Sequence, residues 1–298
     1  MVDKKSKDEI ILKPDAVHGE AASESFFARL MTQFTTAWLF LTRIPLPRWW
    51  NTPDVSQSDE ESEADKGAGM LPLADTVRAW PVVGILLGAL AGLTLWLGAS
   101  AGLSPLAASF IALIVAAVAT GALHEDGLAD VADGFGGGSD KTKKLRIMRD
   151  SHIGAYGVLA LVLVVGFKAG SLSGFNNPAL AAAALLAAHT LSRAALPMLM
   201  VALPPARRTG LGKGAGQPTR EDAVMSAAIG VLIAVLALGI GPGLVAAALA
   251  ALGVAGVGWL AHRHIGGFTG DVLGAAQQVA EALVLAGLAV VLRTVFYA

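Results

Sequence analysis

Seven long apolar stretches restrict the fold of this chain more than any other feature. Most of them approach the roughly 20 residues that an α-helix needs to cross the hydrocarbon layer of a bilayer. They cover residues 80–98, 105–123, 153–175, 179–203, 223–240, 243–261 and the shorter 283–296. We therefore predict an all-α, polytopic integral membrane helical bundle with about seven transmembrane helices.

The composition agrees with a membrane protein. Hydrophobic residues make up 54% of the 298 residues and charged residues 15%, whereas a soluble domain carries about 25% charged residues. The 35 glycines suit helices that pack closely in a membrane. The chain has no cysteine, which excludes disulfides and thiolate metal sites. A net charge of −1 gives no reason to expect nucleic acid as a partner.

Polar segments divide the chain into a tail and one membrane domain. Residues 1–25 mix charges of both signs and lack the apolar core of a secretory signal, so we expect a disordered tail. Residues 26–298 are predicted to form the membrane-embedded catalytic domain, with a polar cytoplasmic loop at 51–78 whose acidic run (54–66) serves solvation. Residues 26–45 are a weaker apolar stretch, and we expect there an N-terminal helix that is interfacial or re-entrant.

Basic residues occur in alternate connections between the apolar stretches. The segments after residues 123, 203 and 261 carry lysines and arginines, whereas the intervening "ASAGLS", "NNP" and "GPG" carry no charge. Because basic loops stay on the cytoplasmic side, we predict that these three connections face the cytoplasm. The polar motifs described next all fall on that side.

An acidic cluster follows the second apolar stretch, in "HEDGLADVADG" (124–134). If these residues continue the preceding helix, Asp126, Asp130 and Asp133 lie on one stripe and Glu125 lies to its side. Carboxylates crowded at a membrane edge repel one another unless a cation compensates them. Mg²⁺ commonly binds through one or two carboxylates and substrate phosphates, so we predict a metal site at these four acids.

Two alternatives concern the same segment. The acids could instead form a solvated helix end that pairs with the lysines at 141–144. The glycines at 134–138 could cradle a phosphate through backbone N–H groups or could form a flexible exit from the helix. Neither nucleotide-binding fingerprint is present.

Further polar residues stand near the other predicted spans. Arg149 and Asp150 precede the third span and suit phosphate binding and general-base or ligand roles. Arg193 lies inside the fourth span, where it must face the bundle interior and a partner. His189, one turn earlier, is interpreted as a packed polar residue. Lys168 raises the same question as Arg193, with a side chain that snorkels outward as the alternative.

The segment "HRHIGGFTGDVLGAAQQVAE" (262–281) contains the second group of polar residues. Thr269 and Asp271 are typical of a helix start after a glycine-rich turn. From Asp271, Gln278 lies two turns further along the same face, and Glu281 lies near its edge. The two histidines of "HRH" do not share a helix face, so a zinc site is not expected.

These features together favour phosphoryl or nucleotidyl transfer between a lipid-associated and a soluble substrate. A metal would neutralise a diphosphate while arginines hold its other oxygens. An ion- or proton-coupled transporter is the alternative from another class, although transporters tend to place such groups near the bilayer midplane. A scaffold for other enzymes would leave the acidic stripe unexplained.

Four motifs in order closely resemble the cobalamin synthase (adenosylcobinamide-GDP ribazoletransferase) family. They are "FLTRIPLP" (40–47), "HEDGLADVADG" (124–134), "MRDSHIGAYG" (148–157) and "GGFTGDVLGAAQQVAE" (266–281). The resemblance implies a bacterial inner-membrane enzyme whose active site faces the cytoplasm. It implies that adenosylcobinamide-GDP reacts with α-ribazole or its 5′-phosphate, with Mg²⁺, to give adenosylcobalamin or its 5′-phosphate and GMP. Association with other cobalamin-assembly enzymes is a further expectation.

The resemblance suggests a role for each candidate residue. Arg149, Arg193 and Thr269 are expected to bind substrate, and Asp150 or Asp271 to accept the proton of the ribazole hydroxyl. The acidic motif is also similar to that of CDP-alcohol phosphotransferases, although the arginine of that pattern is missing and the acids are closer together. A membrane enzyme of that kind with another acceptor is therefore the alternative within the transferases.

Overall fold

The computed structural model describes residues 26–47, 50, 71–207 and 216–297. The predicted tail and the acidic run of the first loop lie outside the described residues. In this part of the chain, six helices are long and apolar enough to cross a membrane, and a bent pair of helices makes up to seven. The prediction of about seven transmembrane helices is therefore confirmed.

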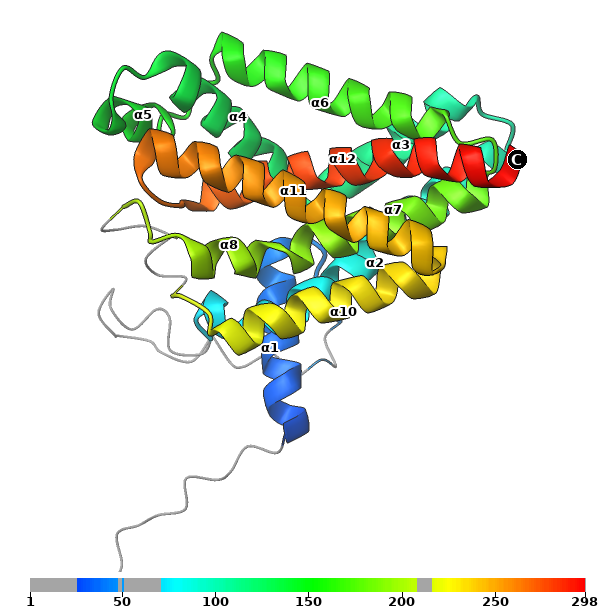
Figure 1. Ribbon diagram of the computed structural model, residues 1–298, viewed down its shortest axis with the longest axis horizontal. Helices are drawn as coiled ribbons and strands as arrows, with labels where there is room; N and C mark the ends of the chain where they lie inside the picture. Colours follow the sequence, from blue (N-terminus) through cyan, green and yellow to red (C-terminus); the bar gives the residue numbers. More distant parts are fainter. Residues whose placement is uncertain (1–25, 48–49, 51–70, 208–215, 298) are drawn as a thin grey trace, which may run out of the picture.

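The helices of the bundle lie side by side (Figure 1). The first four spans involve α2 (Trp80–Ser100), α3 (Pro105–Thr120) with α4 (Leu123–Gly137), α6 (Ala155–Ser173), and α7 (Pro178–Ala194) with α8 (Leu196–Ala202). The last three are α10 (Arg220–Leu238), α11 (Ile240–Ile265) and α12 (Gly270–Tyr297). The short α5 (Lys141–Ile147) connects α4 to α6.

The acidic motif does not continue the preceding helix, contrary to our expectation. Helix α3 ends at Gly121, where φ is 62°, and Ala122 also adopts a left-handed φ of 55°. The chain then turns by 91° into α4. The acids therefore lie on a separate helix that is steeply inclined to α3, while their spacing along one helix is as predicted.

Two further boundaries differ from the prediction. Helix α12 begins at Gly270 and runs for 28 residues, so Asp271, Gln278 and Glu281 belong to the last span rather than to a segment before it. The glycines at 134–138 do not form the flexible exit given as one alternative, because α4 continues to Gly137 and only Gly138 lies beyond it; their role as a phosphate cradle stays a prediction. Side chains at Gly134 and Gly138 would overlap Met148 and Lys144, so these glycines allow α5 to pack against the end of α4.

Helix α1 (Phe26–Leu41) lies apart from the set of spans. In Figure 1 it runs across the direction of the long helices instead of along it. Its inner side contacts η1 (Leu73–Ala79), the 3-10 helix that leads into α2. This placement fits an N-terminal helix that does not span the bilayer, as predicted.

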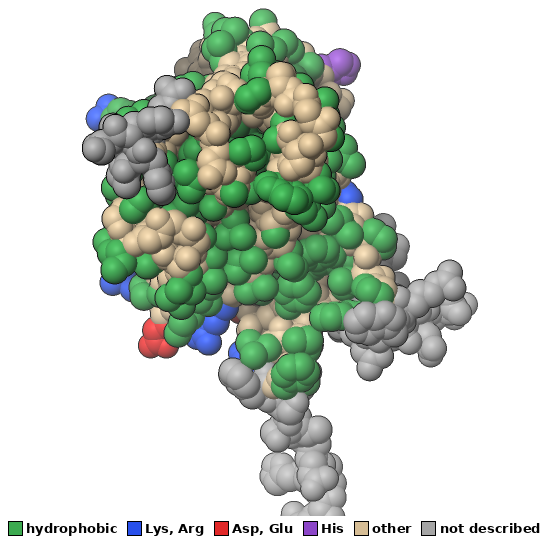
Figure 2. Space-filling view, turned by 90° about the vertical axis from the view of Figure 1, so that its right-hand side faces the viewer, with side chains coloured by type: hydrophobic (Ala, Val, Ile, Leu, Met, Phe, Trp, Pro, Cys, Tyr) green, Lys and Arg blue, Asp and Glu red, His purple; other side chains and the backbone are tan. Residues whose placement is uncertain are grey.

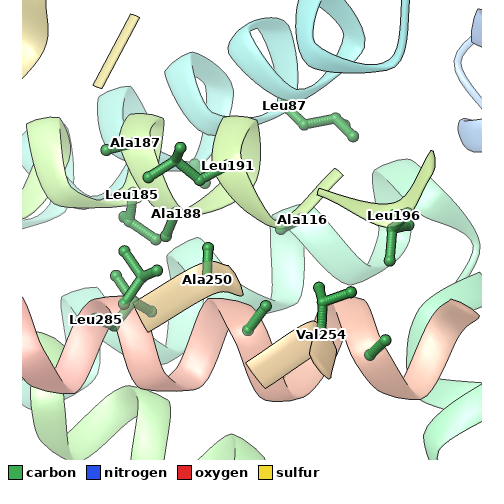
Figure 3. Packing of buried hydrophobic residues seen from close by; sticks show 14 of the residues in the cluster. Leu87, Ala116, Leu185, Ala187, Ala188, Leu191, Leu196, Ala250, Val254 and Leu285 are labelled. Atoms are coloured by element: carbon green, nitrogen blue, oxygen red, sulfur yellow. The ribbon is translucent and has the colours of Figure 1, made fainter. Parts of the chain in front are cut away.

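The core of the bundle is built around α7. Gly84, Gly88 and Gly92 of α2 approach the α7 backbone so closely that an added Cβ at each position would lie 2.6–2.9 Å from it. On its other side, α7 packs Leu185 and Ala188 toward α11 and α12, as Figure 3 shows. The close packing of these helices therefore depends on small residues, which let the helix backbones approach each other.

The outer faces of the helices are apolar, as a bilayer requires. Helix α6 exposes Val162, Leu163 and Phe167 by more than half of their surface. Figure 2, which views the molecule from the right-hand end of Figure 1, shows mainly hydrophobic and uncharged side chains. The three basic connections meet at the opposite end, where α5, the segment after α8 and the turn between α11 and α12 lie together (Figure 1). The predicted segregation of charged and uncharged connections is confirmed.

Candidate active site

The candidate site is built where α4 packs against the start of α12. Gly127 of α4 lies against the backbone of Asp271, and Gly274 of α12 lies against the backbone of His124. A Cβ on Gly127 would be 2.8 Å from the Asp271 carbonyl oxygen. These glycine contacts bring the carboxylate of α12 beside the acidic stripe of α4, although the two are far apart in sequence.

Asp126 and Asp130 form the open part of the acidic stripe. Asp126 is exposed and Asp130 is half-buried. The carboxylates of Asp126, Asp271 and Asp133 are close enough to Asp130 to repel its charge, while Arg207 attracts it. Among the described residues, neither Asp126 nor Asp130 has a hydrogen-bond or ion-pair partner for its carboxylate. These two carboxylates are therefore free to bind a ligand, and their role as metal ligands stays a prediction.

Asp133 has a different environment from the other acids of the stripe. It is buried, and its two carboxylate oxygens accept hydrogen bonds from the backbone N–H groups of Gly154 (2.7 Å) and Gly157 (2.9 Å). These donors lie at the N-terminus of α6, whose first amide groups have no partner within the helix. Asp133 therefore joins α4 to α6, and its role as a metal ligand stays a prediction.

Glu125 connects the acidic stripe to the bundle interior. Its Oε1 accepts a hydrogen bond of 2.9 Å from the side-chain amide of Gln278. Its Oε2 is buried and has no hydrogen-bond partner among the described residues. A buried carboxylate oxygen without a partner is costly, so this atom indicates a missing donor or cation.

Beneath Glu125, a network of polar side chains fills the space between α6, α7 and α12. The Lys168 ammonium donates to Gln278 Oε1 (2.7 Å) and to Glu281 Oε1 (3.0 Å). Glu281 Oε2 lies 3.1 Å from His189 Nδ1 and accepts a 2.6 Å hydrogen bond from Gln277. Lys168 therefore points inward and is paired, so the outward alternative is wrong.

Arg193 belongs to the same interior network. Its side chain is fully enclosed, with 1% of the residue exposed, and it contacts the ring and the carbonyl of His189. Glu281 and Glu125 compensate its charge. Arg193 thus faces the interior and acidic partners, as predicted, but it is enclosed by protein. Its predicted contact with substrate stays untested.

Arg149 and Asp150 lie in the exposed link between α5 and α6. Asp150 pairs with His152, whose Nδ1 lies 2.7 Å from its carboxylate. Hydrogen bonds from the His152 side chain and backbone lower the pKa of Asp150. Because a lower pKa makes a carboxylate a weaker base, this pairing is less favourable for proton acceptance than an unpaired acid.

Thr269 and Asp271 begin the helix that carries the second acidic group, as predicted. The hydroxyl of Thr269 donates to Asp271 Oδ2 (3.2 Å) and accepts from the backbone N–H of Val272 (3.3 Å). Thr269 is buried, so the contacts it makes here are with the protein.

Arg207 also contacts this acid: its Nη2 lies 3.6 Å from Asp271 Oδ2. Arg207 was not among the predicted site residues, because nothing in the sequence sets it apart from the other arginines of the loops.

The described residues contain no group of three or more Asp, Glu or His side chains arranged to hold a metal ion. The predicted ligands therefore do not form a complete cage. Mg²⁺ does not need one, because it often retains waters and takes further ligands from substrate phosphates. Asp126 and Asp130, whose carboxylates have no partner among the described residues, fit such a partial site, whereas the orphaned oxygen of Glu125 is not grouped with them.

A separate cavity of about 600 Å³ lies between α7–α8, α10 and α11. Its lining is almost entirely apolar, with side chains such as Met198, Val231 and Val254. Such walls offer no partners for a nucleotide diphosphate, so the acidic stripe of α4 beside Asp271 is the better candidate for the chemistry.

Comparison with known proteins identifies the family. The family model for cobalamin-5-phosphate synthase matches residues 33–289. A relative from Bradyrhizobium diazoefficiens is 46% identical over 213 residues, which is 72% of this chain and 82% of the relative. One from Azorhizobium caulinodans is 41% identical over 273 residues, 89% of this chain and 98% of the relative. One from Mesorhizobium japonicum is 43% identical, covering 83% and 88%.

All three relatives are named adenosylcobinamide-GDP ribazoletransferase. No solved structure is significantly similar to this chain. The family match covers the acidic stripe, the α5–α6 link and the start of α12, which are the segments that form the site. This chain belongs to the cobalamin-5-phosphate synthase family.

Proposed function

We propose that this chain joins adenosylcobinamide-GDP to α-ribazole or its 5′-phosphate, giving adenosylcobalamin or its 5′-phosphate and GMP, in the late steps of cobalamin biosynthesis. The names of its relatives support these substrates. The structural observation that carries the proposal is the unpaired Asp126–Asp130 pair beside Asp271 and Arg207. This arrangement places acids that can bind a cation beside a positive charge, and a nucleotide diphosphate with its cation needs charges of both signs.

We propose that Asp126 and Asp130 hold Mg²⁺, with Glu125 as a further or outer ligand. Asp133 stays a predicted ligand, although its two backbone hydrogen bonds already support a structural role. When bound, the cation supplies charge neutralisation at the diphosphate and at the departing phosphate. The protein supplies the orientation of the acids through α4 and its glycine contact with α12.

The reaction is a displacement at phosphorus. A ribose hydroxyl of the acceptor attacks the phosphorus bonded to cobinamide, and a new P–O bond forms. The bond between that phosphorus and the bridging oxygen breaks, and GMP leaves with this oxygen. We propose that Asp271 accepts the hydroxyl proton, because it lies beside Asp126 and Asp130, whereas Asp150 lies in the exposed link between α5 and α6 and pairs with His152. Asp150 remains the alternative base.

We further propose that the site faces the cytoplasm of a bacterial inner membrane. The gathering of the basic connections at the end of the bundle that carries the site supports this orientation. Association with other cobalamin-assembly enzymes at this face is a further proposal.

Purified protein in detergent, incubated with adenosylcobinamide-GDP and α-ribazole, tests the function. We expect GMP release that requires Mg²⁺ and is lost on chelation. Asp126→Asn is expected to abolish release while the protein stays in the membrane fraction. Glu221→Gln, an exposed acid at the start of α10, is the matched control and should retain activity. Release at the wild-type rate in Asp126→Asn, or without any divalent cation, would contradict the metal role.

A further inference from the structure

The segment that follows α8 folds back onto the turn before α12. The N–H of Phe268 donates to the carbonyl of Pro204 (2.9 Å), and the N–H of Ala206 donates to the carbonyl of Phe268 (2.8 Å). A side chain at Gly267 would overlap the carbonyl of Pro204, so glycine permits this close approach. The two segments therefore form one backbone unit that fixes Arg207 relative to Asp271.

The Arg207 side chain contacts two other elements, α5 and the start of α12. Its Nη2 donates to the carbonyl of Leu145 in α5 (3.1 Å) and lies 3.6 Å from Asp271 Oδ2. Its Nε is buried and has no hydrogen-bond partner among the described residues. The guanidinium is thus held in place from one side, while at least one of its donors is unused.

The electrostatic environment of Arg207 suits a bound anion. Asp271 and Asp130 attract its charge and Arg149 repels it. Burial lowers the pKa of Arg207 from its ordinary value, and the two carboxylates oppose this effect. A guanidinium stays protonated in proteins, so Arg207 remains a cation. Two guanidinium groups that repel each other, beside acids without partners, suit a ligand that brings both anionic oxygens and a divalent cation.

We propose that Arg207 is a substrate-binding residue and that its guanidinium binds the diphosphate of the nucleotide substrate at the Asp271 side of the site. This inference rests on the proposed function and adds a residue to it. The planar fork of a guanidinium can bind two phosphate oxygens at once, which lysine cannot do. The half-buried Arg207 is therefore better placed to bind an anion than Arg193, which is fully enclosed by protein.

The test compares Arg207→Lys and Arg207→Gln with the wild type and with Arg220→Gln, an exposed arginine at the start of α10. The KM for adenosylcobinamide-GDP and the KM for α-ribazole are measured separately. For Arg207→Gln we expect the first KM to rise by about 10- to 100-fold, as for loss of a charged hydrogen bond. The second KM should stay within about twofold of the wild type. For Arg207→Lys, the KM for adenosylcobinamide-GDP should lie between the values of the wild type and of Arg207→Gln. Both KM values of Arg220→Gln should match the wild type.

A purely structural arginine would give another result. In that case both KM values would change together, the melting temperature in detergent would fall, and Arg207→Lys would restore neither; this outcome overturns the inference. Wild-type KM values in Arg207→Gln overturn it as well. Titration with GDP and Mg²⁺ separates the two proposals. If the wild type binds GDP but releases no GMP, the proposed function fails, and weaker GDP binding by Arg207→Gln still supports the inference.

Discussion

The Nζ of Lys168 lies 3.0 Å from Oε1 of Glu281, and both side chains are almost fully enclosed between α6 and α12. Removing one member of such a buried ion pair is costly, because the other charge then remains buried without compensation. The pair also holds Gln278, which in turn holds Glu125 at the candidate site. The interior network thus links the stability of the bundle to the orientation of a predicted metal ligand.

The first prediction concerns this pair. Lys168→Met should destabilise the protein by about 3–5 kcal/mol, because Glu281 loses a cation in a buried setting. The double variant Lys168→Met/Glu281→Gln should recover part of that loss, because it also removes the carboxylate that the single variant leaves buried without its lysine. Thermal unfolding in detergent measures both, with Lys143→Met on the exposed face of α5 as control. An unchanged melting temperature in Lys168→Met would show that the pair is not structural.

The second prediction separates the acids of the stripe. Asp133→Asn removes one of two acceptors for the amides of Gly154 and Gly157, and we expect a loss of about 1–3 kcal/mol of stability. Asp126→Asn should melt at the wild-type temperature, because its carboxylate has no partner in the described structure. If Asp133→Asn kept wild-type stability but lost its dependence on Mg²⁺, Asp133 would be a ligand instead of a link between helices.

The third prediction tests the glycine contact that assembles the site. Gly127→Ala should push α4 away from α12 and lower transfer activity by about tenfold or more, because an added Cβ would lie 2.8 Å from the Asp271 carbonyl. Gly256→Ala, in α11, is the matched control. Its added methyl group meets no atom within 4 Å, so activity and stability should be retained or slightly increased. Equal effects of the two substitutions would exclude the close contact as the cause.

The fourth prediction distinguishes the two candidate bases. Asp271→Asn should lower kcat by about 100-fold or more, the usual contribution of a general base. Asp150→Asn should lower it far less, because this exposed carboxylate pairs with His152 and not with the acidic stripe. Single-turnover GMP release measures the chemical step for both variants, with melting temperatures as a check on folding. A larger loss in Asp150→Asn would assign the base role to Asp150.

Several properties of this protein could be predicted from the sequence because they depend on neighbours along the chain. Hydropathy over about 20 residues predicts each span. The alternation of basic and uncharged connections predicts which ends of the helices lie together, and Figure 1 bears this out. Helical spacing places Asp126 and Asp130 on one face, and the Thr269–Asp271 segment begins a helix as expected. The motifs themselves carry the family resemblance.

The tertiary structure decided the partners of these residues. The 91° turn after α3 requires a left-handed backbone at Ala122, a residue type that gives no local signal for it. Asp133 was expected to face a metal, but α6 presents two amides to it. Arg207 becomes distinct from other loop arginines only where its segment pairs with the turn at Phe268. The contacts of Asp133 and Arg207 depend on which segments meet in space, and close packing at glycines helps to set this, whereas local sequence preference does not.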